Sequence, residues 1–226
     1  MDRKILHRFV RWSVPQVVEW WRLRLITQTD LLNAPVPGFE KVRDRVFDDI
    51  RDAIRAVCWP EGAETFTIFD QSGKKRGEGS GVKPIKDAFV RLLIKRGWEP
   101  EFPFPISDEE GGRPGKIDAA LKLPKLPPFA VEWETGNISS SHRAMNKMAL
   151  GLIRGILSGG ILVLPTRKLY YYLTDRIGNY EELQPYFSMW SALPAKGYLG
   201  VIAVEHDGVS KKVPRFGKMT DGRAIS

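Results

Sequence analysis

Hydrophobic and polar positions alternate along the chain in patterns that predict both strands and helices. Apolar runs at residues 117–123 and 129–134 predict two strands, and the proline-rich segment 123–128 between them predicts a turn. The run 160–165 is typical of a buried strand. Alternating or β-branched residues predict further strands at 65–69 and 199–205.

Other segments repeat their apolar residues with the helical period of about 3.6. The clearest amphipathic segment is 39–59, and the segment 142–158 begins after consecutive serines that offer N-cap hydroxyls. The segment 84–97 has a proline near its start and a glycine at its end. The predicted helical segments are 4–32, divided near Pro15, then 39–59, 84–97, 142–158 and, in part, 170–190.

The order strand, strand, helix, strand between residues 117 and 165 indicates an α/β core. A chain of 226 residues is long enough for one sizeable domain. We therefore expect a single domain spanning residues 1–226. Its expected parts are a helical N-terminal part (1–60), an α/β core (61–205) and a basic C-terminal tail (206–226).

Three carboxylates mark the predicted pair of strands at 117–134. Asp118 lies in the first strand, and Glu132 and Glu134 lie at the end of the second. Because residues two apart in a strand share a face, both glutamates point to one side and Trp133 to the other. A hairpin would bring Asp118 beside Glu132 and leave the three carboxylates in one small volume.

Carboxylates held close together repel one another unless a proton or a cation lies among them. Oxygen ligands suit Mg²⁺, which takes one or two carboxylates and leaves its other positions for water and phosphate. The carboxylates thus predict a hard-metal site for phosphodiester chemistry. An acidic surface hairpin without a function explains the same residues equally well.

The composition of the chain indicates what kind of molecule it binds and in which compartment it works. Lys and Arg number 35 against 27 Asp and Glu, which gives a net charge of +8 and favours a polyanionic partner. The single cysteine excludes an intrachain disulfide and a cysteine-based zinc cluster, and it suits a reducing compartment. No apolar run is long enough for a membrane span and no signal peptide is evident, so we expect a cytoplasmic protein without membrane contact.

Two groups of basic residues are candidates for phosphate contacts. Lys74, Lys75 and Arg76 are consecutive in a loop rich in glycine and serine, which is either a DNA-contacting loop or a solvated hinge. Arg143 and Lys147 lie one turn apart in the first turns of the predicted helix that follows the carboxylates. They either bind phosphate or balance the charge of the carboxylates.

The run from Val131 to Met148 resembles the active-site segment of the BamHI/BglII-like branch of the PD-(D/E)XK type II restriction endonucleases. Asp118, Glu132 and Glu134 fill the three motif positions, with Glu134 where most of the superfamily has lysine. The resemblance covers residues 83–175. It implies a restriction-endonuclease-like core with a central mixed β-sheet flanked by α-helices.

The resemblance also implies an activity: Mg²⁺-dependent hydrolysis of double-stranded DNA at a short palindromic site, leaving 5′-phosphate ends. Asp118, Glu132 and the backbone carbonyl of Trp133 would hold one or two Mg²⁺ ions, and Glu134 would orient or deprotonate the attacking water. A homodimer would supply one active site per strand. The DNA-contacting candidates are then Lys74, Lys75, Arg76, Asn137, Arg143, Lys147, Arg167 and Lys168.

Two other functions agree with the same residues. A catalytically inactive DNA-binding protein would keep the fold and the basic surface, and it would bind DNA with strong salt dependence but without cutting. A repair or structure-specific nuclease would keep the carboxylates and nick DNA without fixed sites.

Overall fold

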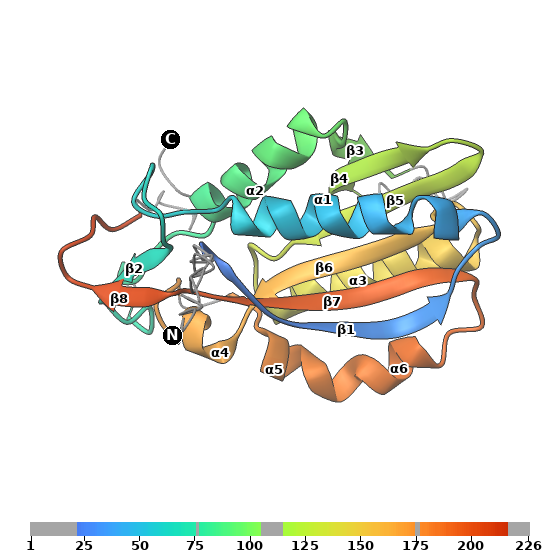
Figure 1. Ribbon diagram of the computed structural model, residues 1–226. Coiled ribbons are helices and arrows are strands. Elements are labelled where there is room, and N and C mark those ends of the chain that lie inside the picture. The colour runs from blue at the N-terminus through green and yellow to red at the C-terminus, as the bar shows by residue number, and fades with distance from the viewer. Residues whose placement is uncertain (1–21, 76, 105–114, 175–176, 217–226) are drawn as a thin grey trace, which may run out of the picture.

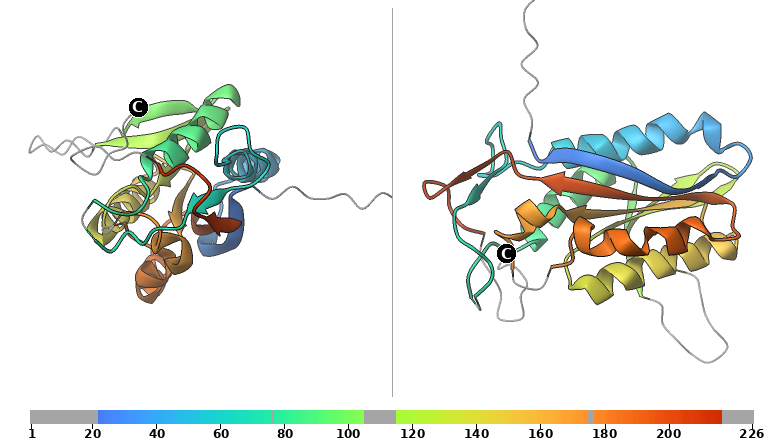
Figure 2. Two further views of the ribbon diagram at one scale, coloured as in Figure 1. Left: turned by 90° about the vertical axis from the view of Figure 1, so that its left-hand side faces the viewer. Right: turned by 90° about the horizontal axis from the view of Figure 1, so that it is seen from below.

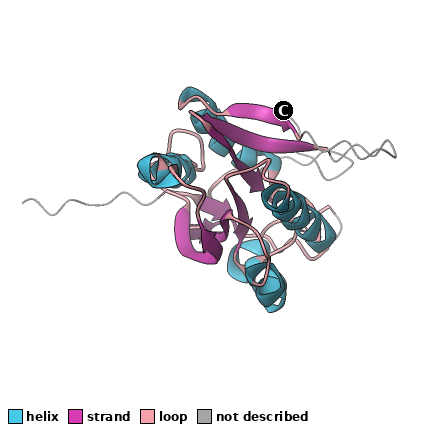
Figure 3. Cartoon of the chain, turned by 90° about the vertical axis from the view of Figure 1, so that its right-hand side faces the viewer, coloured by secondary structure: helices cyan, strands magenta, loops and turns pink. Residues whose placement is uncertain are grey.

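In the computed structural model, which describes residues 22–75, 77–104, 115–174 and 177–216, a six-stranded mixed sheet lies between two layers of helices (Figures 1 and 3). The strand order is β1-β7-β6-β5-β4-β3, with β5, β6 and β7 mutually parallel and the other neighbours antiparallel. The strands are β1 (Arg24–Ala34), β2 (Thr67–Phe69), β3 (Glu99–Pro103), β4 (Lys116–Leu123), β5 (Leu126–Trp133), β6 (Gly159–Pro165), β7 (Gly197–Glu205) and β8 (Gly208–Ser210). The helices are η1 (Phe39–Lys41), α1 (Arg43–Arg55), α2 (Lys83–Lys95), α3 (Ile138–Ile153), α4 (Arg167–Tyr170), α5 (Tyr180–Leu183), η2 (Gln184–Tyr186) and α6 (Phe187–Ser191).

Each face of the sheet has its own hydrophobic core. Successive residues of β6 alternate between them: Ile161 and Val163 pack with α1 and α2, whereas Leu162 and Leu164 pack with α3, α5 and α6. Figure 2 shows α3 and α6 covering one face. Within the described parts of the chain, no helix is both long and apolar enough to cross a bilayer.

One end of the molecule gathers the carboxyl ends of the parallel strands. Helix α4 follows β6 after one residue, and β7 leads directly into β8, which pairs with β2 in a small parallel sheet (Figure 1). Because the parallel strands β5 and β6 end at the same edge, the segments that leave them start close to one another. Polar residues placed just after these strands therefore share one end of the sheet.

Most of the predicted elements are confirmed, with shifted ends. Strands β2, β4, β5, β6 and β7 and helices α1 and α2 lie where the pattern placed them. The turn between β4 and β5 is shorter than expected, because Leu123 pairs with Leu126 and Lys125 takes a positive φ of 60°. Helix α3 begins at Ile138 rather than His142, since Asn137 is its N-cap.

The predicted helix over residues 24–32 is wrong. These residues form β1, which pairs antiparallel with β7 along its length. Every residue of β7 is buried, and without β1 it would be an unpaired edge strand. Strand pairing therefore overrides the helical spacing. The N-terminal part, residues 1–60, which we expected to be helical, contributes one strand to the sheet. β3 was not predicted, and residues 4–21 and 217–226 lie outside the described residues.

The buried His206, just after β7, makes the stability of the protein depend on pH. The His206 ring is 2% exposed and packs edge-on against Tyr172 with centroids 5.2 Å apart. Burial lowers the pKa of His206 from 6.5 to about 4, so the folded state disfavours the charged ring. Its stabilising contribution is therefore complete above pH 6.5 and is lost as the pH falls towards 4.

We expect His206→Phe, which keeps an aromatic ring but cannot titrate, to lose less stability than the wild type over that pH range. Denaturant unfolding of both proteins between pH 4 and 8 measures the difference. Parallel stability curves would contradict the prediction.

Candidate active site

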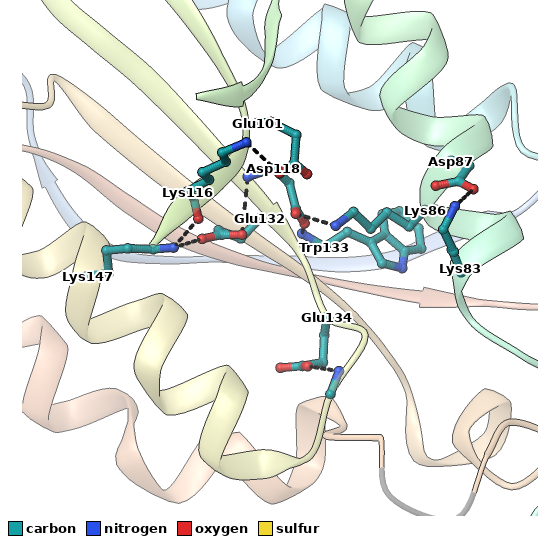
Figure 4. A network of polar contacts seen from close by, with 11 residues as sticks. Lys83, Lys86, Asp87, Glu101, Lys116, Asp118, Glu132, Trp133, Glu134 and Lys147 are labelled. Atoms are coloured by element: carbon teal, nitrogen blue, oxygen red, sulfur yellow. Dashed lines mark hydrogen bonds and ion pairs between the residues drawn. The ribbon is translucent and has the colours of Figure 1, made fainter. Parts of the chain in front are cut away.

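The hairpin of β4 and β5 brings two of the predicted carboxylates together. Ala119 pairs with Val131 across the hairpin, so Asp118 and Glu132 lie at adjoining positions. The Asp118 amide donates to Glu132 Oε2 at 3.3 Å, and Asp118 Oδ2 accepts from the Trp133 amide at 2.8 Å (Figure 4). Each carboxylate is thus fixed by the backbone of the opposite strand.

Trp133 points away from these carboxylates, as the strand alternation predicted. Its indole is 4% exposed and packs on Phe89 of α2, with ring centroids 4.9 Å apart. This contact anchors the end of β5 in the hydrophobic core. The backbone on either side of Trp133 is therefore held in a fixed position.

Glu134 lies on the same side as Glu132, but its carboxylate faces the start of α3. It accepts hydrogen bonds from the Gly136 amide at 2.5 Å and from the Ser141 hydroxyl. Glu134 is 3% exposed. Burial raises its pKa to about 7, although the hydrogen bonds from Ser141 and Gly136 act in the opposite direction. A carboxyl group with this pKa can both take up and release a proton near neutral pH.

The connection from β5 to α3 is tight. Asn137 begins α3, and its side chain accepts from the Ser140 amide at 3.2 Å. Gly136 stands just before it, and a Cβ there would lie 2.5 Å from Ser140 Oγ and 2.8 Å from Ser140 Cβ, so a larger residue would displace Ser140. The short connection places the start of α3 directly beside the carboxylates, where helix amides can attract an anion.

A cavity of about 210 Å³ joins these groups. It is lined by both glutamates, Asp118 and Trp133 from the hairpin, and by Arg143 and Lys147 from α3. Six of the residues that the sequence singled out therefore line one cavity, and both carboxylates and cations are among them.

Two lysines pair with the carboxylates. Lys147 Nζ lies 2.5 Å from Glu132 Oε1 and also donates to the Lys116 carbonyl at 2.6 Å. Lys86, on α2, forms an ion pair with Asp118 Oδ1. Sequence reasoning missed Lys86. The available signal was its position beside the inward-facing Ile85, three residues before Phe89 on the helix.

The charges shift one another. Burial raises the pKa of Glu132, the neighbouring Asp118 carboxylate raises it further, and Lys147 opposes both effects. Burial alone would lower the pKa of Lys86, but Asp118 reverses that effect and raises it. The ionised carboxylates therefore depend on cations close to them.

The residues of the hairpin fit a hard divalent cation. Glu132 Oε1 is buried and accepts no well-aligned hydrogen bond, although the Lys147 ammonium lies close to it. The two carboxylates, held side by side, offer oxygen donors of the kind that Mg²⁺ prefers. Glu134 is drawn towards α3, and in the described part of the chain no three Asp, Glu, His or Cys side chains have the arrangement of metal ligands.

The remaining basic candidates lie elsewhere. Lys74 and Lys75 are exposed, with Lys74 Nζ 5.2 Å from the centre of the Tyr171 ring. Arg167 and Lys168 lie in α4, and Lys168 Nζ is 2.7 Å from Glu205 Oε1. None of these four lines the cavity with Asp118. Arg76 lies outside the described residues.

Comparison with known proteins gives consistent matches. A family model described as restriction endonuclease BamHI matches residues 26–223. Type II restriction enzyme OkrAI of Oceanobacter kriegii is 47% identical over 194 residues, covering 85% of this chain and 94% of OkrAI. Type II restriction enzyme BamHI of Bacillus amyloliquefaciens is 34% identical over 187 residues, covering 81% of this chain and 84% of that enzyme.

The fold has a solved counterpart. The crystal structure of restriction endonuclease BglII complexed with a DNA 16-mer matches with a TM-score of 0.57 and 10% identity, covering 88% of both chains. At this identity the likeness concerns the fold alone. It confirms the predicted restriction-endonuclease-like core with a mixed sheet between helices.

The hydrogen bond from Ser141 to Glu134 generates a stability prediction. Ser141 is fully buried, so Ser141→Ala leaves a buried carboxylate without one of its donors. We expect the free energy of unfolding to fall by about 1–3 kcal/mol. Ser140→Ala is the matched control, with an expected change within about 0.5 kcal/mol. Equal unfolding midpoints for the two variants would contradict the role given to Ser141.

Proposed function

The chain belongs to the BamHI family of restriction endonucleases, and we propose that it hydrolyses double-stranded DNA at a short palindromic site in a Mg²⁺-dependent reaction. The observation that carries the proposal is the shared cavity of Asp118, Glu132 and Glu134, with Arg143 and Lys147 on the facing helix. The carboxylates are suitable ligands for Mg²⁺, and the basic side chains of Arg143 and Lys147 are suitable contacts for a phosphate.

Asp118, Glu132 and the carbonyl of Trp133 are the proposed ligands of one or two Mg²⁺ ions. When bound there, Mg²⁺ would supply the positive charge that polarises a phosphate oxygen. The hydrogen bonds from the backbone to Asp118 and Glu132 support this role, because they hold both carboxylates in position before an ion arrives.

Glu134 is the proposed base. A carboxyl group with a pKa of about 7 can accept the proton of an attacking water near neutral pH. The Ser141 and Gly136 donors orient Glu134 within the cavity. Attack in line with the leaving 3′ oxygen would leave a 5′-phosphate end.

DNA would lie across the end of the sheet where the parallel strands stop. Arg143 and Lys147 line the active-site cavity and are the proposed contacts to the phosphate nearest the cut. Lys74, Lys75, Arg76, Asn137, Arg167 and Lys168 are proposed for contacts farther along the duplex. Two copies of the chain related by a two-fold axis would place one active site on each strand of a palindrome.

Cleavage of plasmid DNA tests the proposed activity. With Mg²⁺ we expect discrete fragments from the wild type, and Glu132→Ala should lower the cleavage rate by roughly 10³-fold or more. Glu99→Ala is the matched control, since Glu99 is a half-buried acid on β3 that pairs with Lys122 at 2.7 Å and does not line the cavity. Plasmid left intact by the wild type across many sequences and divalent ions would refute the activity, while random nicking would indicate a structure-specific nuclease.

DNA affinity tests the phosphate contacts. Arg143→Ala should weaken binding to all sequences and lower the slope of log affinity against log salt by about 1, because one phosphate contact is lost. Arg154→Ala, at the other end of α3, is the control and should leave the slope unchanged. Titrations with Ca²⁺ in place of Mg²⁺ measure binding separately from cutting. Identical slopes for Arg143→Ala and the wild type would remove Arg143 from the contacts.

A further inference from the structure

We propose that Lys86 and Lys147 are internal counter-ions that hold Asp118 and Glu132 in the metal-free enzyme, and that a divalent ion has to displace them before the active site is complete. The inference rests on the proposed function, because it concerns the same carboxylates. It adds a regulatory element: the protein carries its own competitor for the metal.

The two lysines reach the carboxylates from opposite sides of the sheet. Lys86 extends from α2, which belongs to one hydrophobic core, and Lys147 extends from α3, which belongs to the other. Figure 4 shows the two side chains approaching the hairpin from different directions. Each ammonium contacts a different carboxylate: Lys86 contacts Asp118, and Lys147 contacts Glu132.

These ion pairs differ from the surface pairs of the molecule in their burial. The Lys147 and Glu132 side chains are 12% and 10% exposed, and those of Lys86 and Asp118 are 22% and 12% exposed. By contrast, Lys83 and Asp87, one turn along α2, are 48% and 43% exposed. Water screens the exposed pair but screens the buried pairs much less, so only the buried pairs have a strong electrostatic effect.

The charges of the cluster balance. Two carboxylates face two ammonium groups, and the carboxylates are close enough for the amide of one residue to bond the side chain of the other at 3.3 Å. Without the lysines, two buried negative charges would lie side by side, which is strongly unfavourable. The lysines thus offset the charge of both carboxylates and hold them in place.

The same contacts oppose metal binding. Mg²⁺ binds carboxylate oxygen at about 2.0–2.1 Å, whereas the Lys147 nitrogen already lies 2.5 Å from Glu132 Oε1. That oxygen has to release the ammonium before it takes a metal ion. An ammonium that remained in the cavity would also repel the divalent ion. The need to displace the ammonium and its repulsion of the divalent ion both lower the affinity for the metal.

Binding of Mn²⁺ to the protein without DNA tests the proposal, with calorimetry at pH 8 as the readout. Lys86→Met and Lys147→Met keep the length and apolar stem of lysine but remove the charge. We expect each to bind Mn²⁺ on the order of tenfold more tightly than the wild type. Lys83→Met, on the same helix as Lys86 but paired with Asp87, is the matched control and should bind like the wild type.

A charge-conserving variant and a fold measurement complete the experiment. Lys86→Arg should restore the wild-type affinity, and circular dichroism should show the same fold in all variants. Unchanged or weaker Mn²⁺ binding in folded Lys86→Met and Lys147→Met would overturn the counter-ion proposal, while DNA cleavage by the wild type would leave the proposed function standing. A wild type that neither binds Mn²⁺ nor cuts DNA would overturn both.

Discussion

Repulsion between two carboxylates at the end of a buried hairpin is the constraint on which the site depends. Asp118 and Glu132 lie side by side because β4 and β5 pair in a register set by the hydrophobic residues around them. Burial deprives both charges of solvent, so the structure has to supply compensation. It does so with backbone amides and two lysines, and a divalent cation would compensate the same charges.

The fold is arranged so that this compensation comes from separate elements. The hairpin supplies the carboxylates, while α2 and α3 supply cations from the two faces of the sheet. Glu134 stands apart because Ser141 and the Gly136 amide bind its carboxylate at the start of α3. Two carboxylates have lysine partners and one has hydroxyl and amide partners, and these different environments agree with the separate roles proposed for them as metal ligands and base.

The sequence was informative where one local pattern decided the structure. The apolar runs around Asp118 and Glu132 predicted the hairpin, and alternation placed Trp133 on the opposite face. Helical spacing misled over residues 24–32, because pairing with the distant β7 decides the conformation of β1. The position of Lys86 beside Ile85 showed only that it lies near the buried face of α2; its contact with Asp118 spans 32 residues and depends on how α2 packs on the sheet. The start of α3 was misplaced because several polar residues offered caps and only Asn137 takes that role.

A crystal structure of the protein bound to DNA with Ca²⁺ would show whether a divalent ion replaces the lysines as the partner of the carboxylates. We expect an ion within about 2.3–2.6 Å of carboxylate oxygens of both Asp118 and Glu132, with Lys86 and Lys147 released from them. An ion bound elsewhere, or carboxylates that keep their lysine partners while DNA occupies the cavity, would contradict this expectation.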